Sequence, residues 1–568
     1  MAKINLRQCN CRIVRLFTGI AVLLLFFIIA VTTNISFDRG LHASADSGFY
    51  DDSFYLKLSA PDDTKIYYTL NSRIPDENSY LYTEPLLISD ASKNENIYSM
   101  ITDVSFDFRK ELLLQEGAGD DYGYKTPENP IDKATVVRAV AIDGSGNRSN
   151  VITKVYWVGY SQKEAYNNYN IISVVTDPDN LFSYETGIYV IGHTFDDNYE
   201  NGKPVTPLSS FFGEWPANYH MRGIESEREA HVTLLGKNRD LILDGSYGIR
   251  IQGKNSRGAA NKSLNIFARK KYGSSSINGT KIFPDGYAMK SINLNCGGNA
   301  IRNKLPDFLI SSLAGNLDVS TLSYQPCLLF LDGEFWGLYW LTSRYDSKYF
   351  ENIYGAYDDD IIEIKTGAVE IGQPEDINVY NEMVDWISSH DMSIPENYNE
   401  ACDQIDIESC IDYYATEIYI ANDDWPHNNT ALWRTKNISH GKFSDGKWRW
   451  IFFDVNMAMF YIYSRSDWIE YTMEKDAMFA SLMRNDGFKQ KLEGRLVYLA
   501  ENNFNPSVID PFIDEYKTMM TDGMALEFER FYGDNHTIDD FYEECDLIKT
   551  FFDQRYQYII ETYGENNP

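Results

Sequence analysis

Residues 422–434, Asn-Asp-Asp-Trp-Pro-His-Asn-Asn-Thr-Ala-Leu-Trp-Arg, and residues 448–454, Trp-Arg-Trp-Ile-Phe-Phe-Asp, are the most informative parts of this chain. Residues 430–436 and 447–453 predict two strands, because they are rich in Trp, Ile, Phe and Leu. The segment 437–446 between them carries the Asn, Ser, Gly and Asp residues that are typical of a turn. The pattern therefore predicts a β-hairpin with polar residues at its open end.

The open end of this hairpin should bring Asn429 and Asp454 together, because one precedes the first strand and the other follows the second. An amide oxygen and a carboxylate are hard ligands of the kind that Mg²⁺ accepts. Asp424 lies five residues before Asn429 and adds a carboxylate that could face an acceptor hydroxyl. Phosphoryl transfer of the protein-kinase type needs these three groups. A polar loop that caps a surface hairpin is the alternative interpretation.

A second set of residues surrounds Lys262, at the start of a predicted strand over 262–269. Lys262 shares the inward face of that strand with apolar residues, and a lysine in such a place needs an anion. The loop after the preceding strand, 247–253, contains Gly253 and Gly258, whose flexible backbone could hold phosphate. The loop is not a Walker A motif, because no Gly-Lys-Ser/Thr follows. A lysine that simply reaches water from the strand end is the alternative.

The chain has 568 residues and a net charge of −32. Its length predicts two or three domains, and its acidity disfavours a nucleic-acid partner. Its seven cysteines have no metal-ligand spacing, so neither a disulfide scaffold nor a zinc site is expected.

The N-terminus predicts a membrane anchor. Residues 1–15 carry four basic residues and no acid, and in the predicted anchor over 16–34 the residues up to 31 are apolar apart from Thr18. This pattern predicts a single-pass cell membrane protein with a cytoplasmic N-terminus and an extracellular remainder. A cleaved signal peptide is the alternative, but the small residues Ala43–Ala45 lie far beyond the apolar run.

The rest of the chain predicts an α+β protein. Short alternating runs over 46–158 predict a small β-sandwich, and residues from 165 onward begin with strands. Apolar spacing predicts helices at 377–390, 406–421, 476–503, 507–532 and 537–563. A β-rich part followed by a helical part suggests two lobes with a site between them.

The segments 66–70 and 135–141 resemble the immunoglobulin-like domain at the C-terminus of chitobiase and β-hexosaminidase. This resemblance implies an accessory module without catalytic residues. Contact with a wall polysaccharide is a possible role for it.

The remainder resembles the CotH family, the atypical kinases similar to spore coat protein H. The resemblance covers about 165–563 and rests on residues 248–253 with 262–264, 301–305, 331–339, and 422–429 with Arg434 and Phe453-Asp454. It implies a two-lobed, divergent protein-kinase-like domain with a helical C-terminal lobe. It also implies ATP with Mg²⁺ or Mn²⁺ as cofactors, and Ser or Thr of surface or coat proteins as acceptors.

Carried onto this chain, the resemblance implies that Asp424 is the catalytic base and that Asn429 and Asp454 bind the metal. The implied nucleotide-binding residues are Lys262, Gly253, Arg257 and Gly258. Asp423 and Asn428 have the same spacing and form an alternative register. We choose Asp424 because the family reads Asn-x-Asp, which matches 422–424.

Two positions depart from the family pattern. The family often has a second acid two residues after the metal-binding aspartate, where this chain has Asn456, which can still offer an oxygen ligand. Ser343 stands where the family often has glutamate. A non-catalytic surface or wall-binding scaffold is therefore the competing interpretation. A glycoside hydrolase is a weaker one, because no second acid lies at a suitable spacing.

Overall fold

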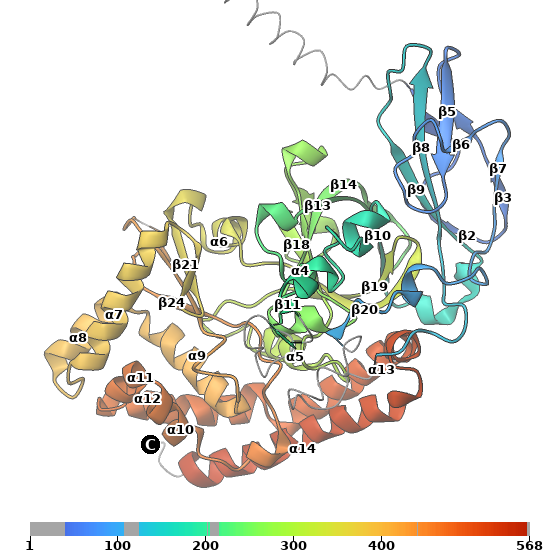
Figure 1. Ribbon diagram of the computed structural model, residues 1–568. Coiled ribbons are helices and arrows are strands. Elements are labelled where there is room, and N and C mark those ends of the chain that lie inside the picture. Colours follow the sequence, from blue (N-terminus) through green and yellow to red (C-terminus); the bar gives the residue numbers. More distant parts are fainter. Residues whose placement is uncertain (1–39, 107–123, 201–202, 205–214, 440, 565–568) are drawn as a thin grey trace, which may run out of the picture. The chain divides into compact units, whose positions relative to one another are not determined.

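The computed structural model describes residues 40–106, 124–200, 203–204, 215–439 and 441–564 (Figure 1). These residues form two compact units. The first comprises the described residues up to Asp46, Phe54–Ile88 and Val137–Lys154, and the second comprises Ser47–Ser53, Ser89–Val136 and the chain from Val155 onward. Residues 89–136, which lie inside the predicted range 46–158, are part of the second unit.

The predicted cytoplasmic tail, 1–15, and membrane anchor, 16–34, lie outside the described residues. Among the residues that are described, no helix has the length and apolar character needed to cross a membrane.

The first unit is built from short strands, as the alternating sequence predicted. Its central pair is β5 (Thr64–Thr69) and β8 (Thr135–Asp143), which run antiparallel with Thr64 opposite Asp143. Apolar residues of both strands are buried, among them Ile66 and Ala139. The other strands of the first unit are β1 (His42–Ala43), β3 (Phe54–Leu56), β4 (Leu58–Ser59), β6 (Tyr80–Leu81) and β7 (Leu86–Ile88). Strand β9 (Ile152–Val158) begins in the first unit and ends in the second, and β2 (Gly48–Tyr50) belongs to the second.

The second unit contains a closed barrel in the order β10-β13-β14-β15-β18-β20-β19. Its strands are β10 (Asn170–Val175), β13 (Arg228–Leu235), β14 (Leu241–Ile251), β15 (Leu264–Phe267), β18 (Ser291–Asn295), β19 (Tyr324–Leu331) and β20 (Glu334–Thr342). Strands β10 and β19 pair in parallel, and the other neighbours are antiparallel. The tight turn between β19 and β20 uses Asp332 and Gly333, both at positive φ.

A four-stranded sheet follows in the order β22-β21-β23-β24. Its strands are β21 (Ile361–Lys365), β22 (Ala368–Ile371), β23 (Ala431–Thr435) and β24 (Arg449–Ile451). Strands β23 and β24 are antiparallel with Ala431 opposite Ile451, so the hairpin predicted from the sequence is confirmed. Short two-stranded pairs are formed by β11 (Tyr199–Glu200) with β12 (Lys203–Pro204) and by β16 (Ile277–Asn278) with β17 (Ala288–Met289).

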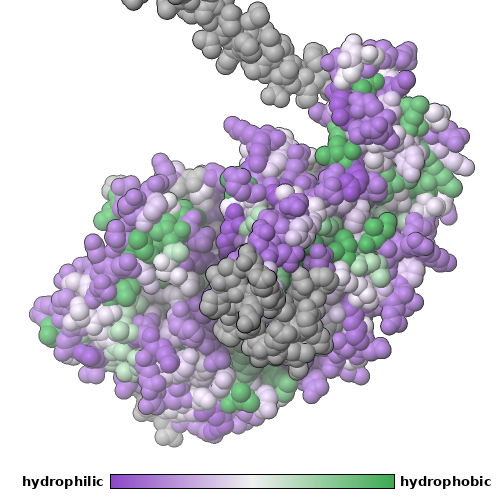
Figure 2. Space-filling view, in the orientation of Figure 1, coloured by the Kyte–Doolittle hydropathy of each residue, from purple (hydrophilic) through white to green (hydrophobic). Residues whose placement is uncertain are grey.

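The later part of the second unit is helical, as predicted (Figure 1). Its helices are α6 (Ser347–Tyr354), α7 (Ile377–Ser389), α8 (Pro395–Gln404), α9 (Ile407–Ile420), α10 (Trp468–Lys475), α11 (Ala477–Leu482), α12 (Asp486–Tyr498), α13 (Pro506–Phe531) and α14 (Ile538–Tyr563). Earlier helices are α3 (Pro178–Phe182), α4 (Gly192–Asp197) and α5 (Pro306–Leu313). Hydrophilic residues predominate on the face drawn in Figure 2, in keeping with the acidic composition.

Candidate active site

The open end of the β23–β24 hairpin brings together the residues that the sequence predicted there. Asn429 directly precedes the hairpin, and its Nδ2 donates to Asp424 Oδ2 at 2.9 Å and to the Asp454 carbonyl oxygen at 3.1 Å. Asn429 and Asp454 have φ of 56° and 58°, a left-handed conformation that Asn and Asp tolerate better than most residues. The hairpin geometry therefore fixes these three residues as one cluster.

Asp424 is the centre of this cluster. Its second oxygen, Oδ1, accepts a hydrogen bond from Asn428 Nδ2 at 2.9 Å. Both amides thus face Asp424, whereas no hydrogen bond joins the Asp423 side chain to either amide in the described part of the chain. The geometry favours Asp424 over the alternative register that begins at Asp423.

A buried acid on α9 holds the turn that carries Asp424. Glu417 is fully buried, and its Oε2 accepts a hydrogen bond from Asn422 Nδ2 at 2.9 Å. The Asn422 Oδ1 in turn accepts from the Asp424 backbone N–H at 3.3 Å. Burial raises the pKa of Glu417 to about 8. Its other oxygen, Oε1, has no hydrogen-bond partner in the described residues, which suits a protonated carboxyl.

Asp454 is exposed at the surface although protein atoms crowd its carboxyl. That crowding raises the pKa of Asp454, the positive charge of Lys365 opposes the rise, and the negative charge of Asp424 adds to it. Asn456 Nδ2 donates to Asp454 Oδ1. Asp454 Oδ2 accepts no hydrogen bond from a described residue, and so it is available to a ligand.

Asp307, in the first turn of α5, is a carboxylate that the sequence interpretation did not include. Its Oδ1 accepts a hydrogen bond from the Val455 backbone N–H at 2.8 Å. Burial raises the pKa of Asp307 to about 7, and the negative charge of Asp454 is the second largest cause of the rise. The Asp307 carboxyl therefore lies close enough to Asp454 for the two charges to oppose each other.

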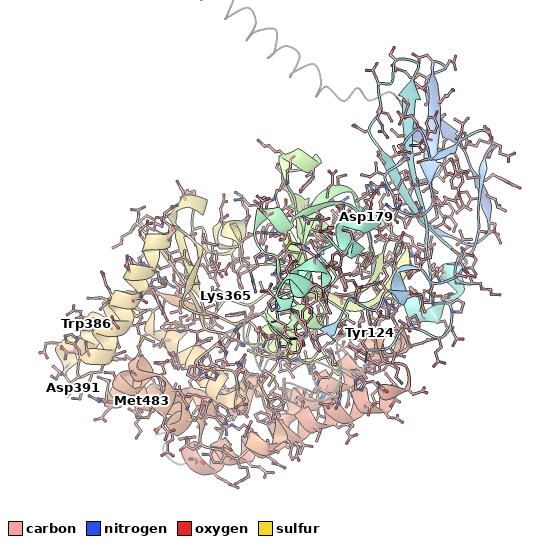
Figure 3. All side chains as sticks on the ribbon, viewed as in Figure 1. Tyr124, Asp179, Lys365, Trp386, Asp391 and Met483 are labelled. Carbon is pink, nitrogen blue, oxygen red and sulfur yellow. The ribbon has the colours of Figure 1, made fainter. Side chains whose placement is uncertain are left out.

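Lys365, the last residue of β21, is the cation of this site. Its Nζ lies 3.7 Å from the centroid of the Phe453 ring. Its positive charge opposes the rise in the pKa of Asp454 and of Asp307. It is partly exposed and forms no hydrogen bond or ion pair with any residue that the structure describes. In the view of Figure 3, Lys365 is drawn between the four-stranded sheet and the barrel. An unpaired ammonium beside acids is suited to bind an anion such as phosphate.

Lys262 has different surroundings from those that the sequence suggested. It precedes β15 and is completely buried. Its Nζ donates to the carbonyl oxygens of Val104, Arg257 and Ala259 at 2.7, 2.5 and 2.6 Å, and it lies 4.2 Å from the centroid of the Tyr219 ring. All three N–H bonds of the ammonium group are therefore used inside the protein.

In the predicted nucleotide loop, the side chains of Arg257 and Lys262 donate hydrogen bonds to backbone carbonyl oxygens of the loop itself. The Arg257 guanidinium donates to the carbonyl oxygens of Gly253 at 2.7 Å, Tyr219 at 2.8 Å and Ile251 at 2.8 Å, and it is buried. Gly253 has φ of 109°, whereas Gly258 lies in a 3₁₀ turn. Within the described residues, no hydrogen bond or ion pair joins this loop to Asp424, Asn429 or Asp454. In the part of the chain that the structure describes, the contacts of Lys262 and Arg257 are with backbone carbonyls and aromatic rings of their own surroundings, and neither side chain donates to a hairpin residue.

A different glycine pair adjoins the hairpin site. Gly297 and Gly298 follow β18 and have φ of 97° and 56°. A Cβ at Gly298 would lie 2.5 Å from Asn456 Nδ2, so only glycine allows this close approach. On its other side, the pair lies over Lys304, whose Nζ forms a buried ion pair of 2.7 Å with Glu527 Oε1 of α13.

The oxygens at the hairpin end fit a hard divalent cation. Asp454 Oδ2, Asn429 Oδ1, Asn456 Oδ1 and Asp307 Oδ2 each lack a hydrogen-bond donor in the described residues. Carboxylate and amide oxygens are the ligands that Mg²⁺ and Mn²⁺ prefer. The described residues contain no group of three or more His, Cys, Asp or Glu placed to hold a metal. A metal ion at the hairpin end would therefore be bound by carboxylate and amide oxygens together.

Comparison with known protein families identifies a kinase-like protein. Sequence comparison matches residues 249–559 to the CotH kinase protein family, and the chain therefore belongs to this family. Residues 56–156 match the Fn3-associated family, in the region of the N-terminal β-sandwich. No curated protein matches the sequence.

The sequence carried weak signals for the residues that the interpretation missed. Lys365 ends an apolar strand and precedes a Thr-Gly turn, which is a common place for a functional side chain. Asp307 follows Pro306 at a helix start, where an acid is ordinary. Gly297 and Gly298 follow a strand directly. None of these signals alone shows which residues meet in space.

Proposed function

We propose that this chain is a protein kinase that transfers the γ-phosphate of ATP to Ser or Thr hydroxyls of proteins. The observation that carries the proposal is the cluster of Asp424, Asn429 and Asp454 at the hairpin end, with Lys365 beside it. Membership of the CotH kinase protein family supports the same chemistry.

In the proposed reaction, Asp424 is the base for the acceptor hydroxyl. Its carboxylate is held in place by the amides of Asn428 and Asn429. A bond forms between the hydroxyl oxygen and the γ-phosphorus, the bond from that phosphorus to the bridging oxygen breaks, and the hydroxyl proton passes to Asp424. General-base catalysis of this kind contributes about 10²- to 10⁴-fold in rate.

Asn429, Asp454 and Asn456 are the proposed metal-binding residues, and Mg²⁺ or Mn²⁺ bound there would neutralise charge on the β- and γ-phosphates. Lys365 is the proposed phosphate-binding lysine, in place of Lys262, because its ammonium is unpaired within the described residues and faces the same acids. The proposal regards the barrel and the helical part as divergent counterparts of the two lobes of a protein kinase.

The proposed location is extracellular, at the cell surface. The basic segment 1–15 and the apolar segment 16–34 support a single-pass anchor with the rest of the chain outside. The proposed substrates are therefore surface or coat proteins, and a contact of the β-sandwich with wall polysaccharide belongs to the same proposal.

The test is autophosphorylation of the full chain with labelled ATP and Mg²⁺ or Mn²⁺, beside the variant Asp454→Ala. The proposal expects label on the wild type and loss of at least about 100-fold in the variant, because the metal site is removed. Absence of label on both chains, together with no change in melting temperature on adding ATP, would instead support a kinase-shaped scaffold.

A further inference from the structure

We infer that Asp307 is a ligand of the metal ion, the second carboxylate of the site. This inference rests on the proposed function, since it concerns the metal that serves phosphate transfer there. Asp307 and Val455 are 148 positions apart in sequence, yet the Asp307 Oδ1 accepts the Val455 N–H at 2.8 Å. That bond ties the carboxyl of α5 to the residue that directly follows Asp454.

The hydrogen bond leaves one oxygen of Asp307 for a ligand. No described residue donates to its Oδ2, and the same is true of Asp454 Oδ2, Asn429 Oδ1 and Asn456 Oδ1. These oxygens come from α5 and from the two chain segments that meet at the open end of the hairpin. They form a set that a cation of Mg²⁺ type could bind, with water and phosphate completing its coordination.

The charge of the site also calls for a second acid. Without Asp307, the proposed ligands are one carboxylate and two neutral amides, and Lys365 adds a positive charge nearby. Divalent-cation affinity rises with the number of charged ligands. Asp307 would supply the negative charge that the set of metal ligands lacks because residue 456 is an asparagine.

A purely structural role for Asp307 is the alternative. An acid in the first turn of a helix often caps its own backbone N–H groups or interacts with the helix dipole. The Asp307 side chain does not cap α5, and its hydrogen bond goes to Val455 instead. The question is therefore whether Asp307 holds the Val455 backbone only, or binds the cation as well.

The variant Asp307→Asn separates these roles, because the asparagine Oδ1 can still accept the Val455 N–H while the negative charge is lost. Binding of Mn²⁺ to the full chain, with and without ATP, is measured by electron paramagnetic resonance. The matched control is Asp486→Asn, an exposed acid in the first turn of α12. Asp454→Asn is the reference for loss of the site.

We expect Asp307→Asn to weaken Mn²⁺ binding by about tenfold or more, with an unchanged melting temperature, and Asp486→Asn to bind as the wild type does. If Asp307→Asn binds Mn²⁺ as tightly as the wild type while Asp454→Asn does not, Asp307 is structural and the proposed kinase function stands. If the wild type itself binds no Mn²⁺ even with ATP, this inference and the proposed function fail together. Asp307→Ser, which also keeps an acceptor oxygen, gives the same comparison if the asparagine variant folds poorly.

Discussion

Lys262 and Lys365 show how burial decides what a lysine can do. The ammonium of Lys262 is enclosed, with three backbone carbonyls as partners, and burial lowers its pKa well below the ordinary value. Lys365 is partly exposed and unpaired among the described residues. The first arrangement stabilises the fold, and the second leaves a charge for a ligand.

The paired variants Lys262→Met and Lys365→Met should therefore behave in opposite ways. Lys262→Met leaves three buried carbonyls without a donor, so we expect the free energy of unfolding to fall by about 3 kcal/mol or more. Lys365→Met should change stability little but weaken ATP binding about 10- to 100-fold, since a charged hydrogen bond contributes about 1.5–3 kcal/mol.

Thermal unfolding and calorimetric titration with ATP and Mg²⁺ check both variants. A folded Lys262→Met chain that has lost ATP affinity would return the nucleotide-binding role to Lys262. Unaltered ATP affinity in Lys365→Met would remove that lysine from the site.

The residues that could be predicted from the sequence are those whose partners are close in sequence or are brought near by a hairpin. Asp424 and Asn429 are five residues apart, and Asp454 follows from the pairing of two neighbouring strands. The surroundings of Lys262 could not be predicted in this way, because Val104, one of its acceptors, lies 158 positions earlier. Asp307 could not be predicted for the same reason, since it comes close to Val455 only in the folded chain.

At the scale of elements, the end of α9 connects the core to the catalytic turn. The helix ends with Ala421 in a left-handed conformation, and the Glu417–Asn422 hydrogen bond spans this end. Burial raises the pKa of Glu417 from 4.5 to about 8. Burial at the α9 terminus thus favours the protonated form of this carboxyl in the folded chain.

This carboxyl should make stability depend on pH. Between its ordinary pKa of 4.5 and about 8, the folded chain holds a proton that the unfolded chain releases, so stability falls as pH rises through this range. Glu417→Gln cannot ionise and should escape this fall. We expect wild type and variant to be similarly stable at about pH 5, with the variant gaining at most about 5 kcal/mol relative to the wild type at about pH 8.5.

Melting temperatures of the two chains across this pH range provide the measurement. A constant difference between them at every pH would show that Glu417 is ionised in the folded protein, contrary to this prediction.

The elements themselves were largely accessible from the sequence. The hairpin over residues 430–453, the turn at Asp332-Gly333 and the long helices α13 and α14 follow from local patterns of turn residues and apolar spacing. The closure of the barrel was not predictable in this way, because β10 pairs in parallel with β19, more than 150 residues later. Such pairing leaves no local signal.

At the scale of the whole molecule, part of the predicted β-sandwich region, 46–158, belongs to the second unit. Residues 89–136 belong to that unit. The backbone N–H groups of Ile97 and Ser99 donate to the buried Glu334 carboxylate at 2.6 and 2.7 Å, and Val104 supplies a carbonyl to Lys262. Residues within the predicted range of the accessory module, 46–158, therefore supply partners to buried groups of the second unit.

Removal of residues 1–158 should consequently destabilise the remaining chain, because the buried Glu334 carboxylate would lose the N–H groups of Ile97 and Ser99 and Lys262 would lose one of its three carbonyl acceptors. Loss of the partners of a buried charge such as Glu334 costs about 3–5 kcal/mol. We expect the truncated chain to be poorly soluble or to melt well below a chain that begins at residue 40. Equal melting temperatures of the two chains would show that 159–568 folds independently.

The most direct test of the central claim compares ATP binding and phosphate transfer in Asp424→Ala on the same preparation. If Asp424 is the base, ATP affinity should stay within about twofold of the wild type while the rate of transfer falls about 10²- to 10⁴-fold. Transfer at the wild-type rate in Asp424→Ala would contradict the account, because the carboxylate at the centre of the hairpin site would then have no part in the chemistry.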